Sequence, residues 1–341
     1  MIVFELPASR DGGDVRAVAL GSCRIRNPIS VLRDRGQLRI RAEGPTPTHT
    51  AAEALQSLDV AMGRRSLPDP LHPFVFETDP GASTERLGRE LRQGIDVFVL
   101  EISDDKQFSH GEFRLNQNFV SRKLVQAHRG ALLDWYREVC RGRPDEETSV
   151  QTALGKLRDA GFAPDEAMAD LLRGIRLDRD DGAAIAETLV ALRRSVGGRW
   201  VVVGPFTTPG DEGDIMRRRR AFNLALEEAA TAHGAVFYDP SRLIAEHGKA
   251  TALAGGGVDI YEYEESFYPT VGETLVALVR AVQPPRRPAV AAPHVLLPAA
   301  VIHDVVRQGW AMRLEAGWNR LAKRVRRLGR RLRRGGAKLL S

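Results

Sequence analysis

Two residues near the N-terminus, Ser22 and Cys23, could carry out covalent chemistry. Together with Gly21 they directly follow the apolar stretch 15–20. A strand that ends in a glycine and a hydroxyl can present a serine nucleophile at the edge of a sheet. The same serine can cap the helix predicted over 27–34, where its oxygen would accept a backbone N–H. The sequence leaves both roles open for Ser22.

The next two side chains offer alternatives. Cys23 is an alternative candidate nucleophile. A cysteine that follows a buried strand is more often a small core residue. Arg24 could bind an anionic group of a substrate, or it could lie on a solvated face. With Gly21, these residues are the first group of candidate site residues.

A histidine that could act as a base lies outside this group. His49 follows the proline-rich loop 44–48, close to the expected edge of the sheet, and is either a substitute base or a surface histidine. Thr50 is predicted to cap the next helix, with Glu53 as its capping partner three residues later. Ser103 and Asn116, which follow a later strand, are candidates for binding substrate or an oxyanion.

Five apolar segments are predicted strands that alternate with helices, which indicates an α/β fold with a parallel five-stranded sheet and helices on both faces. They span 15–21, 37–42, 95–103, 200–205 and 235–240. In such sheets ligands bind at the carboxyl ends of the strands. We therefore expect the polar residues that follow strands to gather at one edge: Ser22, Ser103, Asp104, Thr207 and Asp239.

The remaining organisation is read from periodicity and composition. Apolar spacing over about 145–197 predicts a helical insertion between strands. The folded α/β domain is expected to cover 1–283, followed by a Pro/Ala-rich linker over 284–300 and a basic amphipathic tail over 301–341. Residues 108–118 are expected to form a polar loop.

The tail concentrates the basic charge of the chain. Residues 301–341 contain 12 Arg and Lys residues against two acidic ones, whereas the whole chain has a net charge of +6. Trp310, Leu314, Trp318 and Leu321 recur at helical spacing. Such a helix suits an anionic membrane surface or an acidic protein partner. Nucleic acid is a less favoured partner, and a helix packed on the body with a solvated basic face is the plain alternative.

Composition argues against a disulfide-rich secreted protein and against a membrane-spanning protein. The chain has 341 residues and two cysteines, so a disulfide framework is not indicated. The N-terminus lacks the pattern of a secretory signal, and no apolar run reaches the length of a membrane span. A cytoplasmic protein, peripheral at the inner membrane face through its tail, is expected. No histidine pair has metal-ligand spacing, so neither a metal nor another cofactor is expected.

In order and spacing, these segments resemble the SGNH/GDSL hydrolase superfamily, nearest to the bacterial GSCFA-like proteins. The match is carried by Gly21-Ser22, by the segment 201–205, and by a C-terminal block with Asp259, Glu262 and the segment 268–272. The resemblance implies a flavodoxin-like three-layer sandwich. It also implies a serine nucleophile, a histidine base oriented by an aspartate, and an oxyanion site.

The C-terminal block departs from this pattern at one position. Glu262 stands where the family has its histidine, and Asp259 matches the family's aspartate. A glutamate has a reference pKa of about 4.3, which makes it a weak base toward a serine hydroxyl at neutral pH. Asp259 also follows three glycines, as a turn aspartate commonly does.

The resemblance predicts a serine acyl-ester hydrolase or O-acyltransferase that acts on an acylated carbohydrate or small ester. Ser22 would be the nucleophile, Asp259 and Glu262 the acid–base pair, and His49 a substitute base. The second hypothesis is a catalytically degenerate member that binds a glycan or another ligand and is held at a membrane or partner by its tail. The missing histidine favours this second hypothesis.

Overall fold

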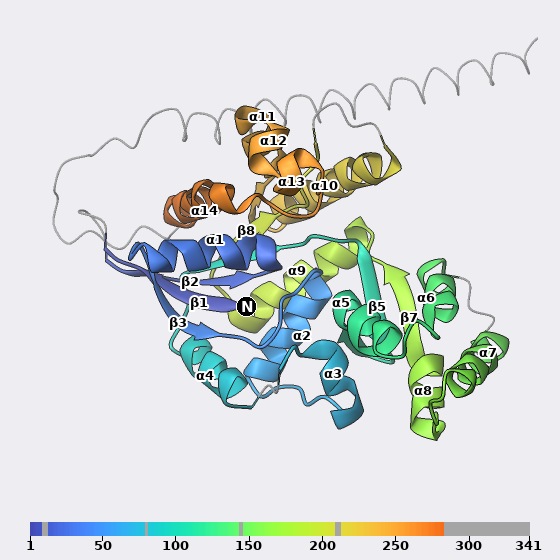
Figure 1. Ribbon diagram of the computed structural model, residues 1–341. Helices are drawn as coiled ribbons and strands as arrows, with labels where there is room; N and C mark the ends of the chain where they lie inside the picture. The colour runs from blue at the N-terminus through green and yellow to red at the C-terminus, as the bar shows by residue number, and fades with distance from the viewer. Residues whose placement is uncertain (9–12, 79–80, 143–145, 209–212, 283–341) are drawn as a thin grey trace, which may run out of the picture. The chain divides into compact units, whose positions relative to one another are not determined.

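The computed structural model describes residues 1–8, 13–78, 81–142, 146–208 and 213–282. Its main sheet has six strands in the order β3-β1-β2-β4-β8-β9 (Figure 1). The strands are β1 (Ile2–Leu6), β2 (Val15–Leu20), β3 (Arg39–Glu43), β4 (Val97–Glu101), β8 (Arg199–Val203) and β9 (Val236–Tyr238). The predicted linker over 284–300 and tail over 301–341 lie outside the described residues.

The five predicted strands share one direction, but a sixth strand separates two of them. β2, β4, β8 and β9 pair in parallel. β1 pairs antiparallel with both β2 and β3. The sheet is therefore mostly parallel, with one antiparallel strand that the prediction of five strands missed. An antiparallel neighbour needs only a short connection, so β1 reaches its place beside β2 without a crossover helix.

Helices cover both faces of this sheet and form a three-layer α/β sandwich (Figure 1). Along β2, Ala17 and Ala19 face one apolar core, and Val18 and Leu20 face the other. The first core is covered by α1 (Cys23–Asp34) and α14 (Tyr268–Val282). The second is covered by α2 (Ala51–Ala61), α4 (Gly81–Arg92), α9 (Gly182–Val196) and α10 (Asp214–Ala232). Burial of β2 on both faces explains its continuous apolar sequence.

A second, antiparallel sheet lies in the segment expected to be loop and helix. It consists of β5 (Lys106–His110), β6 (Phe113–Leu115) and β7 (Ile175–Arg179) in the order β6-β5-β7. The prediction of a polar loop over 108–118 was therefore wrong. Phe108 is fully buried in a third apolar core, and Gly111 has a φ of +57°, which allows the tight turn between β5 and β6.

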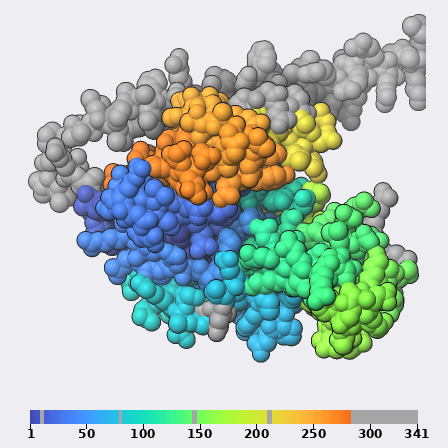
Figure 2. Space-filling view, viewed as in Figure 1, coloured from blue at the N-terminus to red at the C-terminus, as the bar shows by residue number. Residues whose placement is uncertain are grey.

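The helices around this second sheet form a lobe at the side of the main sheet, shown in green in Figure 2. They are α5 (Gln117–Phe119), the π-helix η2 (Val120–Gln126), α6 (Leu133–Cys140), α7 (Glu146–Asp159) and α8 (Glu166–Gly174). Between η2 and α6 the helical conformation is interrupted where Arg129 and Gly130 take positive φ values of 54° and 79°. The predicted helical insertion over 145–197 contains α7, α8 and α9, but also β7.

Short elements complete the described chain. They are η1 (Asp69–Leu71), α3 (His72–Val75), α11 (Ser241–His247), α12 (Lys249–Ala252), α13 (Ala254–Gly257) and η3 (Glu265–Phe267). In the part of the chain that the structure describes, no helix combines the length and hydrophobicity required to cross a bilayer.

Candidate active site at the carboxyl edge of the sheet

Ser22 lies at the turn between β2 and α1, where it caps the helix. Its Oγ accepts the backbone N–H of Arg24 at 3.2 Å and donates to Glu101 Oε2 at 2.7 Å. The Ser22 backbone N–H also donates to Glu101 Oε2 at 2.7 Å. Only 2% of Ser22 is exposed. The capping role anticipated for this serine is therefore present, in a buried network.

The partner of Ser22 is half of a buried ion pair. Arg24 Nη2 lies 2.6 Å from Glu101 Oε1, with little of either side chain exposed. The Arg24 guanidinium also lies 5.0 Å from the centre of the Phe206 ring. Arg24 is therefore buried beneath the turn and does not lie on a solvated face. Burial of two charges is tolerated because each satisfies the other and the carboxylate accepts two further hydrogen bonds.

Glu101 also explains the glycine of the turn. A Cβ placed on Gly21 would lie 2.7 Å from Glu101 Cβ and 2.7 Å from Glu101 Oε2. Sequence reasoning missed Glu101 as a site residue. A signal was available, because Glu101 is an acidic residue within the otherwise apolar run of β4 and it lies at the carboxyl end of that strand.

Cys23 is exposed and is the first residue of α1. Desolvation raises the pKa of its thiol, and the negative charges of Glu262 and Glu101 raise it further. The positive charge of Arg24 and a hydrogen bond with Ser22 oppose this rise in pKa. Of the two adjacent nucleophile candidates, Cys23 has the accessible side chain.

Glu262 lies close enough to Cys23 for its charge to act on the thiol. The Tyr268 hydroxyl donates to Glu262 Oε1 at 3.3 Å and accepts from Asn27 Nδ2 at 3.2 Å. Asn27 belongs to α1, and Tyr268 begins α14. The two helices on this face of the sheet thus position the carboxylate that replaces the expected histidine.

Asp259 is a turn residue, as its neighbouring glycines suggested. It is exposed, and its Oδ1 accepts the backbone N–H of Tyr261 at 2.7 Å. Within the described residues its carboxylate forms no hydrogen bond or ion pair with Ser22, Cys23 or Glu262. The structure therefore does not assemble the expected Asp259–Glu262 pair by direct contact.

His49 faces two polar side chains at the edge of the sheet. Asn118 Nδ2 lies 3.1 Å from Nε2, and Ser103 Oγ lies 3.0 Å from Nδ1. Burial lowers the pKa of His49, which favours the neutral ring. Since the amide donates to Nε2, the ring proton is assigned to Nδ1, which donates to Ser103. The backbone joins this pair to the Ser22 turn, because Thr48 N–H donates to Gly21 O at 3.1 Å.

Asn116 and Glu53 support the loop that carries His49. Asn116 Nδ2 donates to Pro47 O at 3.1 Å, and its Oδ1 accepts the Asn118 N–H at 3.0 Å. Glu53 Oε2 accepts the His49 N–H at 3.0 Å. Burial raises the pKa of Glu53 to about 8. Asn116 was expected at an oxyanion site, but its side chain instead forms hydrogen bonds that stabilise the loop before His49.

Thr207 and Asp239, which were also expected at this edge, belong to a separate network. Thr207 N–H donates to Ser241 Oγ at 2.7 Å, and Ser241 Oγ donates to Asp239 Oδ1 at 2.5 Å. This network joins the end of β8 to the end of β9. In the described residues, no group of three or more His, Cys, Asp or Glu side chains is arranged to hold a metal ion.

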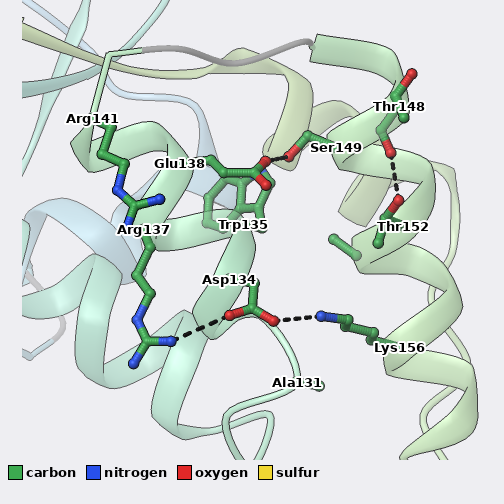
Figure 3. A pocket seen from close by; sticks show the side chains of 11 residues that line it. Ala131, Asp134, Trp135, Arg137, Glu138, Arg141, Thr148, Ser149, Thr152 and Lys156 are labelled. Carbon is green, nitrogen blue, oxygen red and sulfur yellow. Dashed lines mark hydrogen bonds and ion pairs between the residues drawn. The ribbon is translucent and has the colours of Figure 1, made fainter.

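A cavity of about 610 Å³ lies elsewhere, between α6 and α7 (Figure 3). Its polar side chains pair with one another: Asp134 lies 3.3 Å from Arg137 Nη1 and 2.5 Å from Lys156 Nζ, and Ser149 donates to Glu138. Trp135 lines the cavity but is only 4% exposed. None of the predicted site residues lines it.

Comparisons with known proteins place the chain in a family. Residues 15–278 match the model of the TviD N-terminal domain. The Vi polysaccharide biosynthesis protein TviD of Salmonella typhi is 24% identical over 285 aligned positions, and the match covers 79% of this chain and 32% of that protein. The chain thus spans about a third of the length of this curated relative.

A solved structure was also found, with slight similarity. It is a "putative arylesterase" from Agrobacterium tumefaciens str. C58, with a TM-score of 0.26 and 13% identity over 78% of this chain and 98% of that chain. The family assignment rests instead on the match to the domain model, which covers most of the α/β body. The chain belongs to the TviD N-terminal domain family.

Proposed function

We propose that this protein hydrolyses or transfers an acyl ester of a carbohydrate, with the Cys23 thiol as nucleophile and the Glu262 carboxylate as base. The observation that carries the proposal is the exposed thiol at the start of α1, within electrostatic reach of Glu262. The carbohydrate is suggested by the relative named for Vi polysaccharide biosynthesis. The resemblance to SGNH/GDSL hydrolases suggests the acyl chemistry, and the nearer likeness to GSCFA-like proteins stays a prediction.

A carboxylate base favours a thiol over a hydroxyl. Proton transfer from a reference cysteine to a reference glutamate crosses a pKa gap of about 4, or roughly 6 kcal/mol. A hydroxyl with a pKa near that of water, about 15.7, would face a gap of roughly 15 kcal/mol. Glu262 in place of a histidine is therefore compatible with Cys23 and poorly compatible with Ser22. Ser22, the first expected nucleophile, has its Oγ committed to Glu101 and Arg24.

Because the pKa of Cys23 is raised, the reaction needs a base to remove the thiol proton, and we assign this role to Glu262. At neutral pH the group is mainly a thiol, so attack requires that the S–H proton move to Glu262 as the sulfur bonds to the acyl carbon. Because Cys23 and Glu262 share no direct hydrogen bond among the described residues, we route this proton through one water molecule. The sugar oxygen then leaves with that proton, and a thioester remains on Cys23. Water or a second sugar hydroxyl attacks the thioester and gives its proton to Glu262. The departing thiolate recovers the proton, which restores both groups.

We assign two donors at this edge of the sheet to the oxyanion of the reaction. As the first residue of α1, Cys23 has a backbone N–H with no acceptor inside the helix. Ser103 follows the neighbouring strand β4; its Oγ accepts from His49 Nδ1 at 3.0 Å and donates to His49 O over 3.4 Å, a long bond that an oxyanion would replace. We infer that His49 acts through Ser103 by orienting that hydroxyl. This assignment replaces the role of substitute base with one that fits its hydrogen bonds.

A second candidate function is ligand binding without turnover. It is favoured by one observation: within the described residues, the two ring nitrogens of His49 contact Ser103 and Asn118, so His49 does not serve as a base for Ser22. A member of this kind would keep the sheet edge as a carbohydrate-binding surface. The two candidates differ in whether an acyl group becomes attached to Cys23.

The test compares four forms of the full chain with p-nitrophenyl acetate: the unchanged protein, Cys23→Ala, Ser22→Ala and Glu262→Gln. We expect Cys23→Ala to abolish turnover and Glu262→Gln to reduce it by about 10²–10⁴-fold, the usual contribution of a general base. Mass spectrometry of a quenched reaction should find the acetyl group on the peptide that contains Cys23. Cys140, the other free cysteine, serves as the internal control for unspecific acylation.

Each outcome decides between the candidates. Turnover that survives Cys23→Ala but is lost in Ser22→Ala would restore the serine as nucleophile. Equal, slow turnover in all four forms, with no acetyl group on Cys23, would favour binding without catalysis. Ser22→Ala is expected to lose stability as well, so its activity is to be measured at a temperature where circular dichroism shows it folded.

A further inference from the structure

We propose that Tyr261 and Arg219 form the subsite that holds the pyranose ring of the substrate beside Cys23. The choice of a carbohydrate as occupant rests on the proposed function, and the geometry of the subsite is independent of it. Tyr261 is one of the few large apolar or aromatic side chains exposed in the described residues, with 57% of its surface accessible. It directly precedes Glu262 in the chain.

Arg219 holds Tyr261 in place. The guanidinium carbon of Arg219 lies 4.8 Å from the centre of the Tyr261 ring and 5.7 Å from that of Phe206. Arg219 Nη1 donates to Ile260 O at 2.9 Å and to Phe206 O at 3.2 Å. One side chain of α10 thus ties the loop after β8 to the loop that carries Glu262. Asp259 fixes the same loop through the Tyr261 N–H.

A series of side-chain contacts connects the Tyr261 ring to the turn that carries Cys23. Arg24 and Arg219 both lie against the Phe206 ring, at 5.0 Å and 5.7 Å from its centre. Arg24 adjoins Cys23 in the first turn of α1. Tyr261 and the thiol therefore lie on the same edge of the sheet, and a ring that rests on Tyr261 extends along this edge toward Cys23.

The chemistry of the two side chains fits a sugar. A pyranose has an apolar C–H face that packs on an aromatic ring, and hydroxyl and carbonyl oxygens at its rim that accept hydrogen bonds. One face of Tyr261 is taken by the guanidinium, and the exposed part of the ring is available for stacking. Within the described residues Arg219 donates only from Nη1, so its Nε and Nη2 hydrogens can serve the ligand oxygens.

The test measures binding by saturation-transfer NMR in the full chain carrying Cys23→Ala, which prevents turnover. The probes are the methyl tetra-O-acetyl pyranosides of glucose, galactose and mannose. We expect Tyr261→Ala to weaken binding of the preferred probe about tenfold, the effect of losing one stacked ring. Tyr261→Phe, which keeps the ring, should bind within twofold of its parent. Leu224→Ala on α10, which removes another exposed side chain, is the matched surface control.

Two results would overturn the subsite: binding by Tyr261→Ala within twofold of its parent, or no saturation transfer to any of the three probes. Arg219→Lys adds a second measurement, because the loss of the planar guanidinium should weaken binding while the thermal unfolding midpoint reports any loss of folding. Tyr261-dependent binding without Cys23-dependent ester turnover would refute the proposed function and retain the subsite. Cys23-dependent ester turnover without Tyr261-dependent binding would refute the subsite and retain the proposed function.

Discussion

Arg24 Nη2 lies 2.6 Å from Glu101 Oε1 in a buried ion pair that joins the first turn of α1 to the end of β4. The pair supports the turn that presents Cys23, and it places a carboxylate where the main chain and hydroxyl of Ser22 both need an acceptor. The sheet edge is thus built on a polar network beneath an exposed thiol.

Glu101→Gln is expected to destabilise the protein by about 3–5 kcal/mol, because Arg24 would remain buried without a counter-charge. Urea unfolding followed by circular dichroism measures the change. Glu112→Gln is the matched control, since Glu112 pairs with Arg65 while 76% of its side chain is exposed, and its loss should cost about 0–1 kcal/mol. Similar values for the two variants would contradict the role of the buried pair.

Gly21→Ala is expected to destabilise the fold by about 1–3 kcal/mol, because the added methyl group would overlap Glu101. Gly155→Ala in α7 meets no neighbouring atom within 4 Å and should instead stabilise the protein by up to about 1 kcal/mol, since alanine favours a helix. Thermal unfolding measures both changes: the unfolding midpoint should fall in Gly21→Ala and rise in Gly155→Ala. A Gly21→Ala variant as stable as the unchanged protein would show that the turn can relax.

Glu53 should make stability depend on pH in the neutral range. Its pKa is about 8 in the folded protein because of burial, against a reference value of 4.5. The folded state therefore binds the proton more tightly. The stability from this group is full below pH 4.5, declines as the pH rises, and is lost above about pH 8.

Glu53→Gln should remove this dependence, because the amide has the same shape but does not titrate. We expect the free energy of unfolding of the unchanged protein to fall more steeply with pH than that of the variant, by up to about 1.4 kcal/mol per pH unit between pH 5 and 8. Urea unfolding at a series of pH values measures both slopes. Parallel slopes would mean that Glu53 is ionised in the folded protein.

The basic segment 301–341 is predicted to bind anionic membrane surfaces, at about 1 kcal/mol per basic residue near the lipid. The full chain should sediment with vesicles that contain phosphatidylglycerol and remain free with phosphatidylcholine vesicles. A chain that ends at residue 300 should sediment with neither, and added salt should release the full chain. Equal binding to both kinds of vesicle would rule out electrostatic attachment.

The sequence by itself determined the main α/β framework. Apolar runs such as 95–103 and 200–205 are long enough and sufficiently continuous to be buried strands, and four of the five predicted strands pair in parallel as expected. It also placed Gly21, Ser22 and Ser103 at one edge of the sheet, because the ends of parallel strands meet there. The sheet of β5, β6 and β7 escaped prediction since its strands are short and polar, and their burial comes from distant helices.

Only the tertiary structure decided which of the candidate side chains are buried and which are exposed. Ser22 and Cys23 are adjacent in sequence, but β4 brings Glu101 against the first and leaves the second exposed. Glu262 is more than 200 residues from Cys23 in the chain, and its proximity depends on how α1 and α14 pack against the sheet. Local sequence sets the turn, whereas burial, pKa and access are properties of the neighbours that the fold supplies.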